Sequence, residues 1–356
     1  MAAAAGPVAA ATASAVATIN QERYMSPTAP TSIELVADGV LLEVVTAGAA
    51  VRRLALVDGD DETDVALGFA DAAAYGTGRD YLGATIGRYG NRIAGAAFAL
   101  DGIEHTLAAN ENGNALHGGL LGFDQREWAV VDRDERHVRL ALHSPDGDQG
   151  FPGALDVTVT YSVEPGAVRI DYTATSDADT VVNLTNHAYF NLDGEGSGPV
   201  DDHDLLVSAD AFTVVGPGLA PTGELRDVTG TPFDFRRPTR IGDALARDDE
   251  QLVLGGGIDH NLVVRGSGFR HVATLRGRSG RTLVVESDQP GVQVYTGAHF
   301  DGTVVGTSGT AYGPRAGVAL ETQGFPDAPN HPGFPSTVVR AGETYASTTT
   351  WRLRRD

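Results

Sequence analysis

The chain has 356 residues, 42% of them hydrophobic, and it carries a formal net charge of -21 with a pI near 4.7. This length and composition suffice for a sizeable core, and the negative field repels nucleic acid backbones and anionic membrane surfaces. All 26 basic residues are arginine and cysteine is absent, which excludes a Schiff-base or P-loop lysine, a thiolate nucleophile, a disulfide framework and a cysteine-ligated metal.

The first 28 residues are rich in Ala, Thr and Pro and contain no basic residue before Arg23. The positive start of a secretory signal is therefore missing, and we expect a disordered tail at residues 1–28 and a cytoplasmic protein. No run of about 18 apolar residues follows, so a membrane-spanning helix is not predicted. Because no later stretch reads as a linker, residues 29–356 are predicted to form a single domain.

A short surface helix is expected at residues 71–74. The first motif with side chains suited to binding follows it, Gly-Arg-Tyr-Gly-Asn-Arg-Ile at residues 87–93. It lacks the third glycine and the lysine of nucleotide-binding loops. Asn91 and Arg92 instead suit hydroxyl groups, since an amide offers donor and acceptor and a guanidinium forks onto vicinal oxygens. The alternative for Arg92 is a structural ion pair. His117 precedes two glycines, which allow the backbone to approach a ligand closely and to form a turn with positive φ, although such a histidine is more often structural.

The middle of the chain reads as strands. Residues 138–142 alternate, and residues 157–163 and 168–173 do so on either side of a Glu-Pro-Gly-Ala turn, which predicts a hairpin with one buried face. His187 follows in the segment Asn-His-Ala-Tyr-Phe-Asn, where a buried structural histidine and a functional one are equally open.

The last third of the chain adds two carboxylates to the candidate site. After a possible short helix at residues 238–247, Asp259 follows three glycines and starts a strand, which either ligand binding or an Asx turn explains. Further strands are expected at residues 272–276, 283–286 and 344–353. Glu321 ends an apolar run, and a carboxylate at the end of a buried strand needs a partner, which favours a functional role.

Short strands punctuated by 45 Gly and 17 Pro favour an all-β fold, a large antiparallel β-sandwich. Two histidines and two carboxylates on separate segments suggest a site for proton transfer. Two histidines and a carboxylate can also form a metal-binding triad. The usual short His-x-Asp/Glu spacing is absent, so we expect no metal.

Taken together, the motifs resemble the aldose 1-epimerases, also called galactose mutarotases, from about Ile33 to Leu353. The landmarks occur in the same order: residues 87–93, Leu-His-Gly-Gly at 116–119, Asn-His-Ala-Tyr-Phe-Asn-Leu at 186–192, Asp-His-Asn at 259–261, Pro-Gly-Val-Gln-Val-Tyr-Thr-Gly at 290–297 and Glu-Thr-Gln at 321–323. Two positions depart from the pattern: Gly90 stands where the family usually has Ala, and Ala298-His299 where an Asn commonly follows Gly297.

The resemblance implies a galactose mutarotase-like β-sandwich whose cleft binds a free hexopyranose such as galactose or glucose. By motif position, Glu321 is the general base and His187 the general acid. A histidine that is protonated at neutral pH needs a raised pKa, which a nearby carboxylate such as Asp259 could supply. The hydroxyl-binding set is Asn91, Arg92, His117, Asp259 and Gln293. The implied reaction interconverts α and β anomers by opening and closing the ring, which needs no cofactor. We expect a free monosaccharide as partner, neither nucleic acid nor membrane, and a monomer or homodimer.

Three other functions remain open on the sequence. A hexose-6-phosphate epimerase needs a basic cluster at the pocket rim, for which Arg236 and Arg237 are candidates. A glycoside hydrolase can use Asp259 and Glu321 as its paired carboxylates. A non-catalytic carbohydrate-binding protein would bind sugars without changing the rate of mutarotation.

Overall fold

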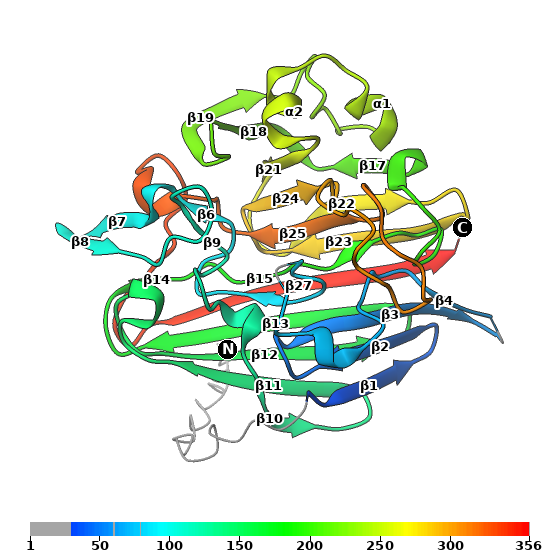
Figure 1. The fold of residues 1–356 in the computed structure, drawn as a ribbon, viewed down its shortest axis with the longest axis horizontal. Helices are drawn as coiled ribbons and strands as arrows, with labels where there is room; N and C mark the ends of the chain where they lie inside the picture. Colours follow the sequence, from blue (N-terminus) through cyan, green and yellow to red (C-terminus); the bar gives the residue numbers. More distant parts are fainter. Residues whose placement is uncertain (1–29, 60, 79, 356) are drawn as a thin grey trace, which may run out of the picture.

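Strands dominate the computed structural model, which describes residues 30–59, 61–78 and 80–355 (Figure 1). The predicted tail at residues 1–28 lies outside the described residues. The α-helices among them are α1 (Ile241–Leu245) and α2 (Glu250–Gly255), with short 3₁₀ turns at Ala72–Ala74, Ala94–Ala96, Phe123–Gln125, Asp148–Gly150, Val200–Asp202 and Ala328–Asn330. No helix in this part of the chain is long and apolar enough to cross a membrane.

Two large antiparallel sheets confirm the predicted β-sandwich. The nine-stranded sheet contains, in spatial order, β10 (Ala129–Arg133), β11 (His137–Ser144), β12 (Leu155–Glu164), β13 (Ala167–Ser176), β27 (Thr344–Arg355), β23 (Arg281–Ser287), β22 (Arg270–Arg276), β17 (Asp204–Val207) and β20 (Thr239–Arg240). The six-stranded sheet contains β16 (Tyr189–Phe190), β25 (Val318–Gln323), β24 (Gly291–Tyr295), β21 (Asp259–Val264), β18 (Ala209–Val215) and β19 (Pro221–Asp227).

Smaller sheets complete the fold. A four-stranded sheet is formed by β1 (Ser32–Ala37), β2 (Val40–Val45), β3 (Ala50–Asp58) and β4 (Asp61–Asp64). Two-stranded pairs are β5 (Thr85–Ile86) with β15 (Thr185–Asn186), β6 (Arg92–Ile93) with β9 (Ala115–Leu116), β7 (Ala97–Leu100) with β8 (Ile103–Thr106), and β14 (Thr180–Val181) with β26 (Val338–Val339). The β6–β9 pair lies beside the segment that follows β25, where the backbone amide of Asp327 donates to the carbonyl of Arg92 (2.8 Å; Figure 1).

Alternation of apolar and polar residues explains the sandwich. The β12–β13 hairpin pairs Val159 with Tyr172 and buries that face, as its sequence predicts. Between the two large sheets, Phe190 of β16 meets Trp351 of β27 edge to face, with ring centroids 5.1 Å apart. Burying such a side chain stabilises the fold by roughly 1.5–3 kcal/mol.

Helix predictions were less accurate than strand predictions. The expected helix at residues 71–74 is one 3₁₀ turn, and that at residues 238–247 is reduced to α1. Helix α2 was not predicted. Asp249 caps it by accepting a hydrogen bond from the Gln251 amide (2.8 Å).

Candidate active site

Strands β21, β24 and β25 bring three polar side chains into one row. In the antiparallel register Asn261 pairs with Gln293, and Gln293 pairs with Glu321. Directly paired residues project from the same face with Cβ atoms about 4.5–5.5 Å apart, so the three side chains lie side by side. The neighbours of Glu321 point the other way: Leu320 joins the core between the sheets and Thr322 hydrogen-bonds Thr349 of β27. The period of the strand therefore turns Glu321 away from the core.

Asp259 is tied to two of the predicted binding residues. Gln293 Nε2 donates to Asp259 Oδ1 at 2.6 Å, and Arg92 Nη1 lies 3.7 Å from Asp259 Oδ2. Arg92 also donates through Nε and Nη2 to both carboxylate oxygens of Glu111, at 3.1 and 2.9 Å. Arg92 thus makes the structural ion pair considered from the sequence and also faces Asp259.

The β6–β9 pair positions Asn91 against His117. The backbone amide of Asn91 donates to His117 Nδ1 at 3.1 Å, so in the neutral ring the proton is on Nε2. Gly118 makes this turn possible: its φ is 89°, and a Cβ there would lie 2.0 Å from the carbonyl oxygen of Gly87. Only glycine fits this position, in keeping with the close backbone approach expected of the Gly-Gly pair.

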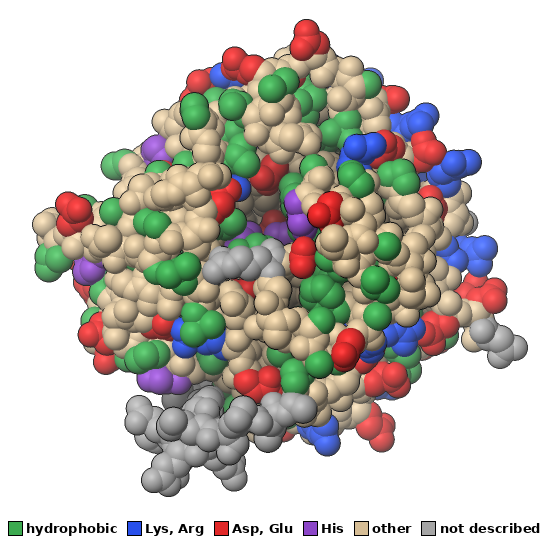
Figure 2. All heavy atoms as spheres, in the orientation of Figure 1, with side chains coloured by type: hydrophobic (Ala, Val, Ile, Leu, Met, Phe, Trp, Pro, Cys, Tyr) green, Lys and Arg blue, Asp and Glu red, His purple; other side chains and the backbone are tan. Residues whose placement is uncertain are grey.

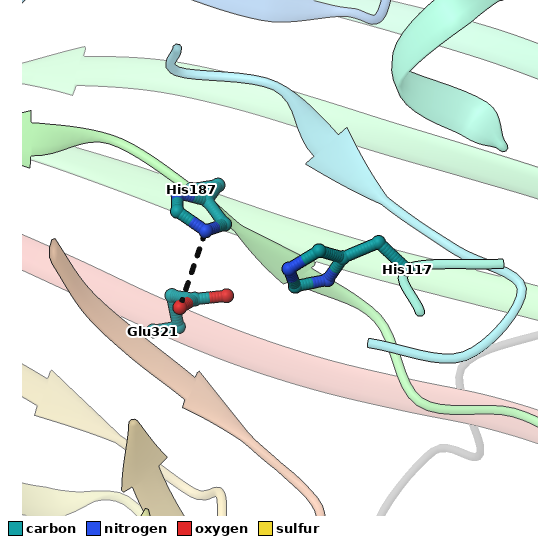
Figure 3. Close-up of side chains that lie close together, drawn as sticks. All are labelled: His117, His187 and Glu321. Carbon is teal, nitrogen blue, oxygen red and sulfur yellow. Dashed lines mark ion pairs between the residues drawn. The ribbon is translucent and has the colours of Figure 1, made fainter. Parts of the chain in front are cut away.

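His187 lies between β15 and β16 and points toward Glu321, with Nε2 3.5 Å from Glu321 Oε1 (Figure 3). The rings of His117 and His187 meet nearly perpendicular, with centroids 5.2 Å apart. Tyr81 stacks over His187 at 5.7 Å and contacts His117 edge to face at 4.6 Å. The imidazole of His187 is therefore held between aromatic rings with one nitrogen directed at the carboxylate.

All seven residues named from the sequence form one closed circuit of neighbours. Its successive members are Asn91, His117, His187, Glu321, Gln293, Asp259 and Arg92, which returns to Asn91 along the chain. The space-filling view shows a hollow in this face of the molecule with histidine and acidic side chains in it (Figure 2). The circuit is thus a polar site on the face of the six-stranded sheet that points away from the core between the two sheets.

Burial controls the protonation of the central pair. It raises the pKa of Glu321 well above its usual range, and the charge of Asp259 raises it further while Arg92 opposes both. Burial lowers the pKa of His187 to about 3. Our expectation that Asp259 raises the pKa of His187 was therefore wrong. Both pKa shifts favour the neutral forms, which are a protonated carboxyl group on Glu321 and an uncharged imidazole on His187.

Two further residues of the site were not singled out from the sequence. Both amide atoms of Asn261 and of Gln323 are buried without a hydrogen-bond partner in the described chain. The same holds for Gln293 Oε1, Glu321 Oε2 and His187 Nδ1. Such atoms are rare in folded proteins unless water or a ligand satisfies them. The sequence signal was present, since Asn261 and Gln323 lie two residues from Asp259 and Glu321 and so on the same strand face.

His117, His187 and Glu321 also form a group with metal-binding side chains. Their ligand atoms lie within 4.8 Å of one another. Tetrahedral zinc with bonds near 2.1 Å brings ligand atoms to about 3.4 Å, so the three side chains would have to converge to bind it. His117 Nδ1 already accepts from Asn91, which leaves Nε2 as the nitrogen available for a metal.

Comparisons with known proteins identify the family of this chain. The family model described as aldose 1-epimerase matches residues 31–352. The galactose mutarotase of Homo sapiens is 41% identical over 325 residues, covering 90% of this chain and 93% of the relative. The aldose 1-epimerase of Escherichia coli K12 is 39% identical over 324 residues, covering 88% and 92%.

Among solved structures, an aldose epimerase homologue from C. elegans superimposes with a TM-score of 0.85 at 30% identity, covering 92% of this chain and 99% of that one. A galactose 1-epimerase from Lactobacillus acidophilus NCFM gives a TM-score of 0.81 at 30% identity, covering 92% and 95%. Fold, motif order and sequence identity over nine-tenths of the chain lead to one conclusion: this chain belongs to the aldose 1-epimerase family.

Proposed function

We propose that this protein is an aldose 1-epimerase that interconverts the α and β anomers of free hexoses, with galactose and glucose as substrates. Glu321 acts as general base on the C1 hydroxyl and His187 as general acid on the ring oxygen. The residues that bind the sugar hydroxyls are Asn91, Arg92, His117, Asp259 and Gln293.

The reaction needs only two proton transfers. Glu321 takes the proton of the C1 hydroxyl while His187 gives a proton to the ring oxygen, and the bond between C1 and the ring oxygen breaks to give the open-chain aldehyde. Rotation about the C1–C2 bond presents the other face of the carbonyl. Closure with both transfers reversed forms the other anomer and restores both side chains. Positioned acids and bases contribute about 10²- to 10⁴-fold each.

The proton count of the pair is compatible with these roles. Catalysis starts from ionised Glu321 and protonated His187, whereas burial favours protonated Glu321 and neutral His187. The two forms contain the same number of protons and differ by one transfer across the 3.5 Å contact. Sugar hydroxyls that pair with the unsatisfied polar atoms of the site would stabilise the ionised form.

The row of unpaired buried polar atoms on β21, β24 and β25 is the observation that carries this proposal. Unpaired hydrogen-bond donors and acceptors lie beside the proposed acid His187 and base Glu321. They belong to Asn261, Gln293, Gln323 and Glu321 itself. A pyranose carries a hydroxyl on almost every carbon, each both donor and acceptor. Such a ligand can satisfy the whole row at once.

The hexose-6-phosphate alternative loses its structural basis. Arg236 and Arg237 line a surface cavity with Gly230, Asp234, Thr239 and Arg247, and none of the seven site residues contributes to it. Phe233, just before them, packs on His260, whose side chain points to the opposite face of β21 from Asp259. The two arginines therefore do not form the rim of the site.

The domain and cellular setting belong to the same proposal. One hydrophobic cluster extends from Ile33 to Leu353, which supports residues 29–356 as a single domain. We propose a cytoplasmic monomer or homodimer that works without a cofactor. Cell fractionation and light scattering of the purified chain test the location and the oligomeric state.

Polarimetry is the direct test of the activity. Freshly dissolved α-D-galactose and α-D-glucose should approach their equilibrium rotation faster with the protein than without it, and Glu321→Gln should abolish most of the acceleration. Sugar binding with no acceleration by the wild-type protein would instead indicate a carbohydrate-binding function. Release of sugar from an aryl glycoside would indicate a hydrolase.

A further inference from the structure

Two loops carry a polar pair to the outer edge of the site, beyond the circuit of seven residues. Asp80 lies just before Tyr81, which stacks over His187, and His299 follows β24. His299 Nε2 lies 3.6 Å from Asp80 Oδ1. Their side chains are 35% and 29% exposed, against 4% and 1% for His187 and Glu321. The pair therefore stands between the buried acid and base and the solvent.

The tautomer of His299 is constrained by Tyr295. The backbone amide of His299 donates to the Tyr295 hydroxyl at 3.2 Å, and that hydroxyl lies 2.8 Å from His299 Nδ1. With its oxygen already accepting, the hydroxyl is placed to donate to Nδ1. This arrangement favours the tautomer with the proton on Nε2, directed at Asp80.

Aromatic packing fixes the ring of His299 in this position. It stacks on Tyr295 with centroids 5.7 Å apart and 19° between the planes, and it contacts Phe300 at 4.1 Å. Tyr189 contacts both His187, at 4.9 Å, and His299, at 6.0 Å. His299 is thus one aromatic layer outward from the general acid.

The donor and the acceptor of this pair suit a hydroxyl group. At 3.6 Å the contact between Nε2 and Oδ1 is too long for a hydrogen bond. A hydroxyl can accept from the imidazole N–H and donate to the carboxylate at the same time. One ligand hydroxyl placed to the side of this contact can therefore bridge Asp80 and His299.

The proposed chemistry identifies which sugar hydroxyl reaches this place. With Glu321 at the C1 hydroxyl and His187 at the ring oxygen, the next ring atom beyond His187 is C5, which bears the hydroxymethyl group. That arm consequently leaves the ring on the His187 side. Asp80 and His299 lie on this side, next to Tyr81 and Tyr189, whose rings contact His187. The C2 and C3 hydroxyls leave on the side of Glu321 and Gln293.

We propose that Asp80 and His299 form an outer subsite that binds the C6 hydroxyl of the hexose and so favours hexoses with a free hydroxymethyl group. The inference rests on the proposed function, because the roles of Glu321 and His187 orient the ring. A site built to bind a hydroxyl discriminates strongly against the analogue that lacks it, since its buried or half-buried polar groups are then left without a partner.

A comparison of D-galactose with 6-deoxy-D-galactose tests the subsite with the full-length chain. Asp80→Ala and His299→Phe should each lower kcat/KM for galactose by about tenfold, mainly through KM, and should change kcat/KM for the deoxy sugar less than twofold. Phenylalanine keeps the ring stacking on Tyr295 while removing the donor. Asp301→Asn is the matched control, because it removes a carboxylate near His299 whose side chain accepts hydrogen bonds from Thr303 and none from Asp80 or His299.

The outcomes separate this inference from the proposed function. If the wild-type protein does not accelerate mutarotation of either sugar, the proposed function fails first. If the wild-type protein is active but the variants lose equal activity on both sugars, or gain activity on disaccharides, the pair is a wall of the pocket and the subsite is wrong. Thermal unfolding of each variant, expected within a few degrees of wild type, excludes loss of fold as the cause.

Discussion

His187 Nε2 and Glu321 Oε1 lie 3.5 Å apart in a buried site, and burial pushes their pKa values in opposite directions, to about 3 for His187 and well above the usual range for Glu321. The pair therefore rests with its proton on the carboxyl. The proposed base is thus protonated at rest, and the proposed acid is neutral. This inversion determines how the variants of the pair should behave.

Glu321→Gln should lower kcat by about 10²-fold or more and at the same time stabilise the fold. The raised pKa means that the folded state binds the proton more tightly than the unfolded chain, so stability falls as pH rises above the unfolded value of about 4.3. The amide removes this penalty. Calorimetry should give a higher Tm than wild type at pH 7 and a smaller difference near pH 4. An unchanged or lower Tm at pH 7 would show that the carboxylate is well solvated.

His187→Asn should also lower kcat by about 10²-fold or more, and the double variant with Glu321→Gln should be little worse than the poorer single variant. Both proton transfers belong to one step. Once one side chain of the pair is replaced, replacing the other should therefore lower kcat little further. Single-turnover polarimetry on the three variants measures this. Strictly multiplicative losses would place the two side chains in independent steps.

The sugar-binding set should respond differently. An alanine substitution should lower kcat/KM chiefly through KM at Arg92, His117, Asp259 or Gln293. Each substitution leaves a polar partner without a hydrogen bond, which weakens sugar binding by roughly 1–3 kcal/mol. Asp259→Ala is the informative case, since its carboxylate holds Gln293 Nε2 at 2.6 Å and faces Arg92. A fall in kcat for this variant as large as that for Glu321→Gln would make Asp259 the base.

Local sequence was sufficient for much of the fold and for the candidate residues. Strand alternation predicted the β12–β13 hairpin, and the Gly-Gly pair predicted the tight turn after His117. The row formed by Asn261, Gln293 and Glu321 was beyond reach, because it depends on the register of strands tens of residues apart in the chain. Which buried polar atoms lack a partner follows from that register.

The protonation of the site also required the structure. From the sequence, Asp259 was expected to raise the pKa of His187. In the structure Asp259 is engaged by Arg92 and Gln293, and the enclosing rings of Tyr81 and Tyr189 bury His187. Desolvation therefore decides the shift.

Exhaustive dialysis against a chelator should leave turnover unchanged, because proton transfer alone accomplishes the proposed reaction. Added Zn²⁺ should inhibit competitively with the sugar, since His117, His187 and Glu321 offer ligand atoms within 4.8 Å of one another. His117→Ala is the matched variant and should weaken zinc inhibition. Activity lost on dialysis and restored by a divalent ion would reassign these three residues as ligands of a required metal.

The pH dependence tests the inverted pair directly. In the proposed mechanism the active form of the pair has an ionised Glu321 and a protonated His187. Wild-type kcat should fall in acid, because the pair gains a second proton at a pH set by the His187 pKa of about 3. It should also fall in alkali, because the pair loses its remaining titratable proton at a pH set by the raised pKa of Glu321. His187→Asn isolates Glu321: its residual kcat should rise with pH, because only the ionised carboxylate accepts a proton, and the midpoint should lie well above the ordinary value of about 4.3. Glu321→Gln isolates His187, and its residual kcat should fall as pH rises. A midpoint near 4.3 for His187→Asn would mean that Glu321 is ionised at rest and that the pair is an ordinary one.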